Sequence, residues 1–488
     1  MTRPLPLPAS DPVDPVPDLS PAGRSSPIQK ADRLAITPTV PGLDLPVETT
    51  VRDAIYDRIP LSAPELALIG TPAFLRLDRI QQLGFVSRVW PGAKHTRFEH
   101  SLGVLHLTRL ALEHLRRTPA GAAAIGEDDA RTIAAAALLH DIGHYPFSHA
   151  IEELGAPVRS HEAIGATRIR EGEIATILRD QWGVRPERVA AIVFEDLDAL
   201  SPIDHLLRSI LSGPLDMDKL DYLPRDAHGC NVPYGGVDTT RLIDALGIAA
   251  VPETVVRDGT PQAAGERVVV GSKGVSALHS LINARQAMFD NVYWHHTNRA
   301  CMAMLLRAVQ EAVIAGAIDA GELPEHDDAS LLSCLGRPGM PDGTQRLTAA
   351  LIERRVHKRA VEVSRLAWEL YGRLGNLFHD PAARRQVEIL LAEGLSAELG
   401  TTVPADAILI DIPKPEKWRT NVWVTFARPP VGFAPIMPWR DVAGMSDEDF
   451  KRYEEHRRLI RIVAAEPWRE AVVRHWEHLL MPLLGGVL

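Results

Sequence analysis

The sequence predicts a mainly α-helical protein with one small β-hairpin and a C-terminal lobe that mixes helices and strands. Through most of the chain, apolar residues recur every three or four positions, which is the period of a helix with one buried face. Short runs typical of strands gather near residues 250–270 and again beyond residue 400. Hydrophobic side chains make up 45% of the chain, so a sizeable buried core is available.

Length, charge and cysteine content narrow the class of protein. A chain of 488 residues favours one large domain with a second lobe over a single core. The net charge of −10 provides no overall attraction to nucleic acid or to anionic membranes. Cys230, Cys301 and Cys334 have no CxxC spacing, which argues against a disulfide framework and a thiolate zinc site. With no signal-like or membrane-spanning segment, we expect a cytoplasmic protein.

The first part of the chain is rich in proline. Eleven of the 38 prolines fall within residues 1–46, and proline fixes φ and removes a backbone donor. We therefore expect residues 1–48 to form a disordered or extended tail, and we assign it no function.

The helical pattern begins near Val51 and continues past a break at Thr71 and Pro72. The first apolar positions of this pattern are Leu66, Ile69, Phe74, Leu77, Ile80 and Leu83. Further amphipathic runs cover residues 101–117, 130–140, 203–212, 274–317, 347–374 and 383–398.

Strands are expected in two places. Residues 253–256 and 267–270 flank a turn that contains glycine and proline, which predicts a hairpin. Residues 407–412 and 421–426 are short apolar runs that favour strands in the C-terminal lobe. We expect a core domain over residues 49–320 and a helical or α+β lobe over residues 321–488.

A dense histidine cluster follows the alanine-rich apolar run at 133–139. Residues 140–161 contain four histidines, where even scattering of the chain's 19 would place fewer than one. Imidazole and carboxylate together suit a divalent cation, and two further candidates, His100 and Asp218, lie outside the cluster. If these converge with His140 and Asp141, coordination sites remain open for water and a phosphate oxygen.

An ordered set of motifs resembles the HD-domain metal-dependent phosphohydrolases. More narrowly, the chain resembles the deoxynucleoside triphosphate triphosphohydrolase branch, which includes the SAM-and-HD-domain enzymes and their dGTPase-like bacterial relatives. The resemblance covers roughly residues 50–300 and extends more weakly to about 375. The matching segments are QLG at 82–84, PGA at 91–93, RFEHSLGV at 97–104, HDIGHYPFSH at 140–149, HE at 161–162, DMDKLDYLPRD at 216–226, YG at 234–235 and residues 285–293.

This resemblance implies a metal centre and a triphosphate site within an HD-domain helical core. The implied metal ligands are His100, His140, Asp141 and Asp218, and the ion could be manganese, iron or magnesium, with zinc or nickel as further options. The implied phosphate contacts are Arg97, Lys219, Tyr222 and Arg285, with His144 and His161 beside the reacting phosphate. A polyphosphate needs several positive donors around it, which agrees with this set.

The resemblance also implies an acid catalyst and a sugar site. His149 and Glu152 lie three residues apart, and a carboxylate beside an imidazole raises its proton affinity, which suits His149 to protonate a departing 5′-oxygen. Many family members have aspartate at position 152. The implied contacts of a deoxyribose are Gln82, Leu83, Asp226 and Tyr293. The implied products are a deoxynucleoside and inorganic tripolyphosphate.

Some positions depart from the family pattern. The aspartate and arginine that bind an activating guanine nucleotide in the animal members correspond to Gly70 and Asp78 here, so activation at an equivalent site is not expected. Phe289 and the pair His295 and His296 replace some polar residues near the phosphate channel. The resemblance also implies a homo-oligomer.

Other interpretations stay open. The same metal site could serve an HD-type phosphodiesterase, a nuclease or an alarmone hydrolase. The basic stretches at 354–359 and 457–461 could bind nucleic acid or a regulatory nucleotide, although solvated helix faces explain them more simply. His95 and His106 have no role in the motifs and are expected to be ordinary structural residues.

Overall fold

The computed structural model describes residues 38–194, 199–213, 215–255, 261–262, 264–414, 421–446, 448–449 and 458–486. The predicted tail therefore lies outside the described residues as far as Thr37. From Pro38 onward the chain forms one compact unit. Its first residues already belong to the core, because Val40 and Leu43 are buried and Thr39 forms a β-bridge with Pro46.

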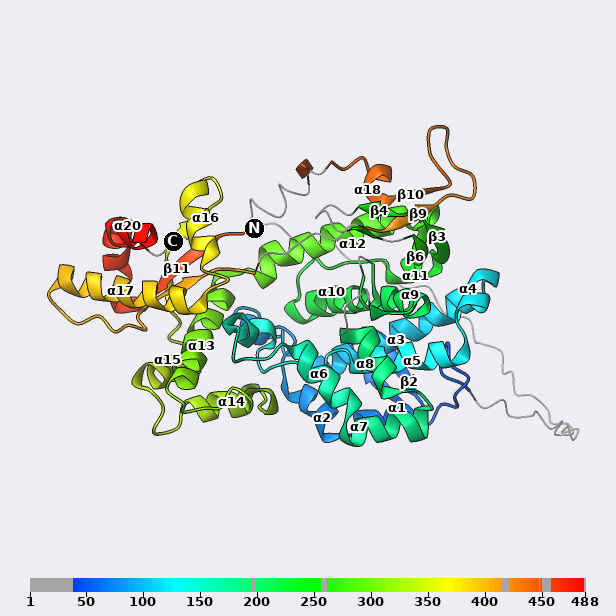
Figure 1. Cartoon of the computed structure of the whole chain (residues 1–488), viewed down its shortest axis with the longest axis horizontal. Coiled ribbons are helices and arrows are strands. Elements are labelled where there is room, and N and C mark those ends of the chain that lie inside the picture. The colour runs from blue at the N-terminus through cyan, green and yellow to red at the C-terminus, as the bar shows by residue number, and fades with distance from the viewer. Residues whose placement is uncertain are drawn as a thin grey trace, which may run out of the picture. The chain divides into compact units, whose positions relative to one another are not determined.

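The N-terminal half is a bundle of helices around one large hydrophobic core, as predicted. In this bundle α3 packs against α5 and α10, and α5 packs against α8 (Figure 1). Its helices are α1 (Ala63–Ile69), α2 (Pro72–Leu75), α3 (Arg97–Arg116), α4 (Pro119–Ala124), α5 (Glu127–Leu139), α6 (His161–Arg170), α7 (Gly172–Ile177), α8 (Pro186–Phe194), α9 (Pro202–Leu211), α10 (Met217–Cys230) and α11 (Thr239–Asp244). Three 3₁₀ helices, η1 (Arg76–Arg79), η2 (Gly84–Arg88) and η3 (Ser148–Leu154), connect them.

Local chemistry explains where the two central helices begin. Helix α3 starts with a capping box, in which Thr96 accepts a hydrogen bond from the Glu99 amide and the Glu99 carboxylate accepts one from the Thr96 amide. Helix α5 has three acidic residues in its first turn, which stabilise the positive end of the helix dipole. The alanines of α5 are fully buried, so neighbouring helices approach its backbone closely.

Helices α3 and α10 meet at Gly103. A Cβ atom at this position would lie 1.9 Å from Asp221 Oδ1 and 2.5 Å from Arg225 Nη2, both of which belong to a buried ion pair. Glycine is therefore required for the close approach of the two helices.

We expect Gly103→Ala to lower the free energy of unfolding by about 3 kcal/mol or more, because it forces apart a packed, charged interface. Urea unfolding followed by circular dichroism measures this loss. Gly372→Ala is the matched control, since Gly372 is an exposed helix residue where an added Cβ atom would have no described atom within 4 Å. An equal effect of the two substitutions would contradict the packing argument.

The helical pattern expected from Val51 is wrong for its first eleven residues. Strands β1 (Thr49–Asp53) and β2 (Asp57–Leu61) form an antiparallel hairpin there. Its turn is closed by Asp53 Oδ1, which accepts hydrogen bonds from the amides of Ile55 and Tyr56, and Asp57 adopts φ 59°. An Asx turn of this kind competes with helix formation, and the apolar period that supported a helix begins only at α1.

The run predicted at 274–317 is helical but interrupted. Helix α12 (Val275–Met288) continues as one π-helical turn, η7 (Phe289–Tyr293), and α13 (His296–Ile314) begins after Trp294 and His295. The interruption places Tyr293 and Arg285 on the wall of the cavity described below. π-helical turns of this kind are frequent at functional sites.

The predicted hairpin exists, but its first strand was misplaced. Strand β6 (Gly265–Gly271) pairs with β3 (Leu246–Val251), whereas β4 (Thr254–Val255) pairs with β5 (Pro261–Gln262). Residues 256–260 and residue 263 lie outside the described residues. The strand LGIAAV was missed because glycine and alanine have low strand propensity. Strand β6 also pairs in parallel with β9 (Trp423–Thr425), which pairs with β10 (Ile436–Pro438) ahead of the short helix α18 (Trp439–Val442).

The C-terminal lobe combines helices and strands, as expected. Strand β11 (Ile460–Ala464) lies between β7 (Lys358–Val363) and β8 (Ile408–Asp411) in an antiparallel sheet. The strands expected at 407–412 and 421–426 are confirmed by β8 and β9. The helices of this part are α14 (Asp328–Leu335), α15 (Asp342–Ile352), α16 (Trp368–Asn376), α17 (Pro381–Leu399) and α20 (Arg469–Gly486).

Two expectations for this lobe are wrong. The run at 347–374 is not one helical segment, because β7 separates α15 from α16. The described parts of the two basic stretches are not helix faces either, because β7 and β11 pair directly, and Glu362 joins Arg359 and Arg461 through contacts of 3.0 and 3.2 Å. Arg457 lies outside the described residues. A strand whose partner is a hundred residues away leaves little local signal.

No helix in the described part of the chain combines the length and apolar character needed to cross a membrane.

Candidate active site

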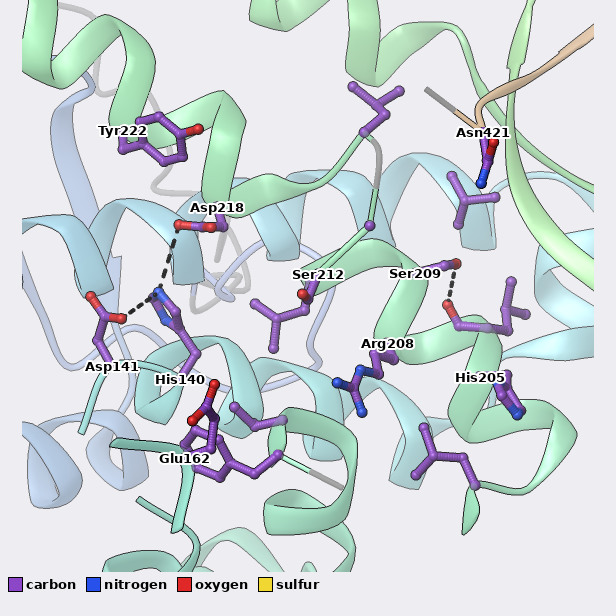
Figure 2. Close-up of a pocket in the computed structure, with 18 of the residues that line it drawn as sticks. His140, Asp141, Glu162, His205, Arg208, Ser209, Ser212, Asp218, Tyr222 and Asn421 are labelled. Carbon is purple, nitrogen blue, oxygen red and sulfur yellow. Dashed lines mark hydrogen bonds and ion pairs between the residues drawn. The ribbon is translucent and has the colours of Figure 1, made fainter. Parts of the chain in front are cut away.

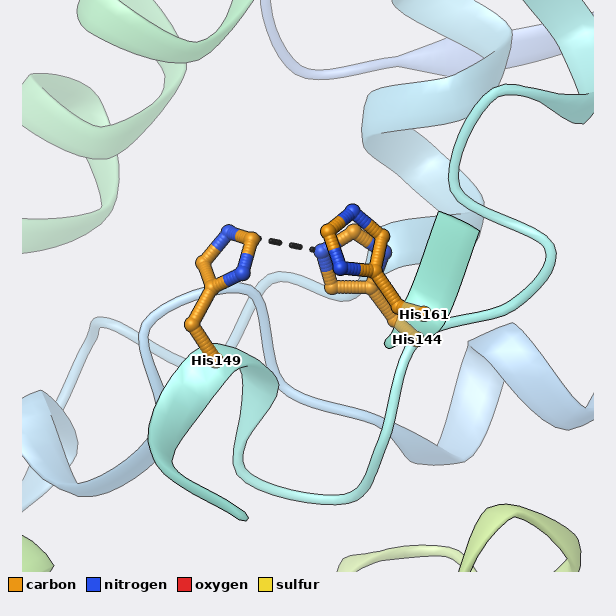
Figure 3. A group of neighbouring side chains, drawn as sticks. All are labelled: His144, His149 and His161. Carbon is orange, nitrogen blue, oxygen red and sulfur yellow. Dashed lines mark hydrogen bonds between the residues drawn. The ribbon is translucent and has the colours of Figure 1, made fainter. Parts of the chain in front are cut away.

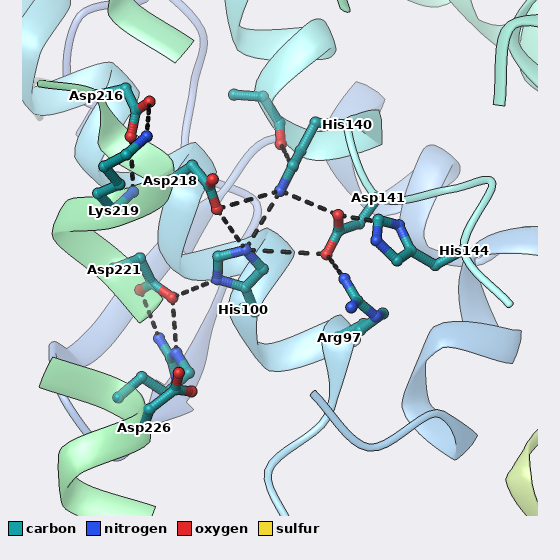
Figure 4. Close-up of polar contacts among 12 residues, drawn as sticks. Arg97, His100, His140, Asp141, His144, Asp216, Asp218, Lys219, Asp221 and Asp226 are labelled. Carbon is teal, nitrogen blue, oxygen red and sulfur yellow. Dashed lines mark hydrogen bonds and ion pairs between the residues drawn. The ribbon is translucent and has the colours of Figure 1, made fainter. Parts of the chain in front are cut away.

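The four predicted metal ligands converge where α3, α5 and α10 meet (Figure 4). His100 Nε2 lies 3.2 Å from His140 Nε2 and 3.0 Å from Asp218 Oδ1. Asp141 Oδ1 lies 3.4 Å from His140 Nε2, and Asp141 Oδ2 lies 3.8 Å from His100 Nε2. Two imidazole nitrogens and two carboxylates thus face one small space.

The outer nitrogens of the two imidazoles orient this centre. His140 Nδ1 lies 2.8 Å from the carbonyl oxygen of Ala137, and His100 Nδ1 lies 2.8 Å from Asp221 Oδ2. Because both acceptors require a proton on Nδ1, the neutral rings carry lone pairs on Nε2. Two lone pairs 3.2 Å apart repel each other unless a cation or a proton lies between them. The donor set therefore fits a divalent cation.

The charges around the centre also favour a cation. Burial would raise the pKa of Asp141, but Arg97 and the surrounding imidazoles outweigh it and hold that pKa well below its usual value. Hydrogen bonding to His100 likewise lowers the pKa of Asp218 against the effect of burial. Although burial disfavours its charge, His100 has a pKa raised to about 10 by Asp218, Asp221 and Asp141. Positive charge is thus strongly stabilised here, as a metal site requires.

Asp221 is a functional residue that the sequence analysis missed. Its Oδ2 accepts hydrogen bonds from His100 Nδ1 and Arg225 Nε, and its Oδ1 accepts one from the Tyr56 hydroxyl at 2.9 Å. Arg225 also donates to Asp53 Oδ2 at 2.8 Å, so the hairpin β1–β2 supports the metal centre from behind. A usable signal was the spacing of Asp221, three residues after Asp218 on one face of α10.

We expect Asp221→Asn to weaken divalent-cation binding about 10- to 100-fold, because partners that orient a metal-binding histidine contribute that much to metal affinity. Titration calorimetry with Mn²⁺ measures the change. Asp238→Asn is a suitable control, since Asp238 caps α11 away from the centre and asparagine caps equally well. Unchanged Mn²⁺ affinity in Asp221→Asn would refute the orienting role.

Arg97 lies beside the metal centre rather than pointing freely into solvent. Its Nη1 donates to Asp141 Oδ2 at 2.5 Å, and the side chain is 4% exposed while still lining the cavity. Arg97 thus neutralises a ligand and presents positive charge to whatever occupies the cavity. The predicted contact with the α-phosphate stays a prediction.

Next to the centre, His144, His149 and His161 form a second cluster, the histidine cluster (Figure 3), and Glu152 contacts two of its members. His149 Nδ1 lies 3.1 Å from Glu152 Oε2, and His161 Nδ1 lies 2.7 Å from Glu152 Oε1. One carboxylate therefore orients two imidazoles, and His149 Nε2 lies 3.4 Å from His144 Nε2. The ligand atoms of the three histidines are also close enough to hold a metal ion.

The pKa of His149 is shifted downward, whereas the neighbouring Glu152 led us to expect an upward shift. Glu152 raises it, but desolvation, His161 and Arg97 outweigh that contribution and lower the pKa below its usual value. Burial and Arg97 also lower the pKa of His144, well below its usual value. Glu152 itself is held ionised, because its bonds to the two histidines lower its pKa despite burial. A lowered pKa makes the protonated His149 imidazole a stronger acid but leaves a smaller fraction of it protonated near neutral pH.

A cavity of about 2040 Å³ contains both clusters and most of the predicted substrate residues. Figure 2 shows part of its lining, with His140, Asp141 and Asp218 at one end. Gln82 lines the same cavity, and its Oε1 is buried without a hydrogen-bond partner among the described residues. The predicted sugar and phosphate residues that line it are Gln82, Leu83, Arg97, Tyr222, Asp226, Arg285 and Tyr293.

Lys219 is the exception among these predictions. It is not part of the described lining, and its Nζ donates to Asp216 Oδ2 at 2.7 Å and to the Gly213 carbonyl at 2.9 Å. Asp216 caps the start of α10 and draws the lysine toward the helix end. A phosphate contact by Lys219 therefore requires a different side-chain conformation.

His95, which has no role in the motifs, contacts the predicted sugar residue Asp226. Its Nε2 lies 2.7 Å from Asp226 Oδ1, while the Tyr293 hydroxyl donates to Asp226 Oδ2 at 2.7 Å. The His95 carbonyl also accepts a hydrogen bond from the Gln82 amide. His106 instead packs its ring against Tyr56, and burial lowers its pKa to about 4, as a structural residue would show.

The far side of the cavity was not anticipated. Helix α9 contributes His205, Arg208 and Ser209 to the lining, and Ser212 lies just beyond the end of this helix (Figure 2). Asn421 comes from the C-terminal part of the chain. Helix α9 was predicted only from its apolar period, and its polar face gave no motif. Glu162 lines the cavity beside His161.

These helices and the His/Asp centre define an HD domain. Residues 97–220 match the model of the HD domain, and residues 237–425 match that of the HD associated region. The chain therefore contains an HD domain followed by an HD associated region, and an HD domain implies a divalent metal.

Curated relatives share this part of the chain. An uncharacterized protein of Methanocaldococcus jannaschii is 31% identical over 286 residues, which cover 58% of this chain and 54% of the relative. The human deoxynucleoside triphosphate triphosphohydrolase SAMHD1 is 28% identical over 290 residues, which cover 54% of this chain and 44% of the human enzyme. The chain spans about half the length of the curated relatives it matches.

Two solved structures have the same fold. A hypothetical protein from Aquifex aeolicus superposes with a TM-score of 0.65 at 25% identity, over 88% of this chain and all of that protein. A phosphohydrolase from Bacteroides thetaiotaomicron superposes with a TM-score of 0.61 at 23% identity, over 86% of this chain and 99% of that one. The second likeness is one of fold alone.

Proposed function

We propose that this protein is a metal-dependent phosphohydrolase that converts deoxynucleoside triphosphates to deoxynucleosides and inorganic tripolyphosphate. The observation that carries the proposal is a single cavity that contains the His/Asp centre, the histidine cluster and seven predicted sugar or phosphate residues. The name of human SAMHD1, a deoxynucleoside triphosphate triphosphohydrolase, supports this choice of substrate.

His100, His140, Asp141 and Asp218 would hold the cation in this mechanism. When bound, the cation supplies Lewis-acid activation of water and of a phosphate oxygen. Arg97 stabilises the negative charge that develops on the α-phosphate, and Arg285 binds the outer phosphates. Tyr222 lies on the same wall and contacts the phosphate chain.

The reaction exchanges one bond for another. The oxygen of water forms a bond to the α-phosphorus as the bond between that phosphorus and the 5′-oxygen breaks. His149 donates a proton to the departing 5′-oxygen, while Glu152 holds the imidazole in position. His144 and His161 line the reacting phosphate, and His161 shares the Glu152 carboxylate.

The remaining lining residues are assigned to the sugar. Gln82 and Asp226 bind the 3′-hydroxyl, Tyr293 packs on the ring, and Leu83 leaves no space for a 2′-hydroxyl. The proposal includes a cytoplasmic location and a homo-oligomeric state, as the resemblance implies.

Product analysis tests the proposal directly. The protein is incubated with Mn²⁺ and each of the four deoxynucleoside triphosphates, singly and mixed, and the products are separated by chromatography. We expect a deoxynucleoside and tripolyphosphate. Release of monophosphate or diphosphate would show attack at another phosphorus, and absence of turnover would favour a phosphodiesterase, a nuclease, an alarmone hydrolase or a binding protein.

We expect Leu83→Ala to relax the selection of deoxyribose. The smaller side chain leaves space for a 2′-hydroxyl, so kcat/KM for ribonucleoside triphosphates should rise about 10-fold relative to the deoxy substrates, a change of about 1.4 kcal/mol. Competition assays with paired ribo- and deoxynucleotides measure the ratio. Leu75→Ala is the control, because Leu75 is an exposed leucine of α2. An unchanged ratio would remove Leu83 from the sugar site.

A further inference from the structure

One carboxylate from the HD associated region holds two loops of the candidate active site. Asp328 is the first residue of α14 and is 8% exposed. Its Oδ1 accepts a hydrogen bond from the Phe147 amide at 2.8 Å, and its Oδ2 accepts one from the Gln81 amide at 3.0 Å. Neither the motifs nor the family resemblance drew attention to this residue.

The two amides belong to the segments that carry the sugar and acid residues. Gln81 directly precedes Gln82, and Phe147 lies two residues before His149. The Ser148 hydroxyl donates to the Gln82 carbonyl at 3.1 Å, so the two segments also contact each other. Asp328 therefore sets the separation between the sugar side and the acid side of the cavity.

The acid segment needs such support because its backbone is strained. Phe147 and Ser148 adopt φ values of 57° and 64°, in the left-handed region that residues other than glycine rarely occupy. Strain of this kind costs about 1 kcal/mol or more per residue and persists only where neighbouring groups impose it. The bond from the Phe147 amide to Asp328 and the stacking of Phe147 on Phe85, at 4.4 Å between centroids, supply that restraint.

The segment ahead of α14 makes further contacts with the same loops. Arg76 donates from Nη2 to the His144 carbonyl and from Nε to the His326 carbonyl, at 2.8 and 2.9 Å. Arg76 thus joins residue 326 to the loop that carries His144. Burial raises the pKa of Asp328 to about 6, while the two backbone hydrogen bonds and Arg97 act in the opposite direction and favour the ionised carboxylate.

We propose that Asp328 is a positioning residue, which holds Gln82 and His149 at the separation that the substrate requires. The proposal rests on the proposed function for its kinetic effect, but its structural part does not. The HD associated region then completes the active site instead of only following it in the chain.

Asp328→Asn tests this role with almost no change in shape. An amide has one acceptor oxygen, so one of the two backbone amides would face an NH₂ group instead of a carboxylate oxygen. We expect kcat to fall about 10- to 100-fold through displacement of His149, with less discrimination between deoxy- and ribonucleotides through Gln82. Equal kcat and equal discrimination in the variant and the wild type would overturn the proposal.

Asp327→Asn is the matched control. Asp327 is the adjacent residue, its partner Arg79 is exposed, and its role as the cap of α14 is one that asparagine performs equally well. We expect wild-type kcat and discrimination from this variant. An equal loss in both variants would mean that Asp328 acts only through the stability of α14, which would also overturn the proposal.

Hydrogen–deuterium exchange separates this proposal from the proposed function, since it needs no substrate. In Asp328→Asn we expect faster exchange confined to residues 78–85 and 143–150. Unchanged exchange there, or faster exchange over the whole chain, would overturn the proposal even if the protein hydrolyses deoxynucleotides. If the wild type hydrolyses no deoxynucleotide, the proposed function fails, but faster exchange confined to these residues would still support the positioning role of Asp328. Should Asp328→Asn not fold, Arg76→Lys removes the parallel link and is judged by the same exchange and kinetic criteria.

Discussion

Asp141→Asn is expected to abolish hydrolysis, with a loss of about 1000-fold or more in kcat. The substitution removes a negative charge that faces both imidazoles of the centre and leaves the buried Arg97 without its carboxylate partner. A metal centre contributes several kcal/mol to catalysis of phosphate chemistry, and each 1.4 kcal/mol corresponds to a factor of about ten. Turnover of each deoxynucleotide and bound metal by mass spectrometry are measured on the same sample.

The control for this loss is Asp57→Asn. Asp57 is exposed in the β1–β2 turn at φ 59°, a conformation that asparagine tolerates well, and it undergoes the same chemical change. We expect wild-type activity and metal content from it. If Asp141→Asn kept full activity without bound metal, the centre would have no part in the reaction.

His149→Gln is expected to lower kcat about 100- to 10,000-fold while metal binding persists. General acid catalysis accounts for rate factors of this size, and glutamine cannot protonate a departing 5′-oxygen. His149 lies in the histidine cluster and bonds to Glu152, while the predicted metal ligands lie in the adjacent centre. Steady-state kinetics with a deoxynucleotide and Mn²⁺ calorimetry separate the two effects.

The leaving group offers a sharper test of the same residue. A p-nitrophenyl phosphate ester has a leaving group that departs without protonation. The rate of its hydrolysis by His149→Gln should therefore fall far less, relative to the wild type, than the rate of deoxynucleotide hydrolysis. The Asp141→Asn variant should lose both reactions alike. Equal losses on both substrates in His149→Gln would mean that this histidine orients or binds phosphate and does not act as the acid.

The helices of the core could be predicted because their signals are local. Helix α3 carries its own capping box at Thr96 and Glu99, and α5 combines an acidic first turn with an apolar run. The strands could not be predicted equally well. The hairpin at 49–61 depends on an Asx turn at Asp53, and β7 depends on pairing with β11, a hundred residues later. Neither feature changes the apolar period on which the helical prediction was based.

The candidate site likewise contains residues that could be predicted and residues that could not. His100, His140, Asp141 and Asp218 could be named from the order of motifs, and the structure brings them together as expected. The residues that support them could not be named. Asp221 contacts His100 Nδ1 from α10, and that contact across the core has no counterpart in the order of motifs.

The mainly helical class, the positions of the His/Asp motifs and the residue types that favour a divalent cation could all be read from local patterns in the sequence. Only the tertiary structure decided which side chains orient those residues, because hydrogen-bond partners such as Asp221 and Asp328 come from distant segments and leave no pattern of spacing. It also decided that the net effect of the surroundings lowers the pKa of His149, since burial and neighbouring charge depend on packing and not on sequence distance.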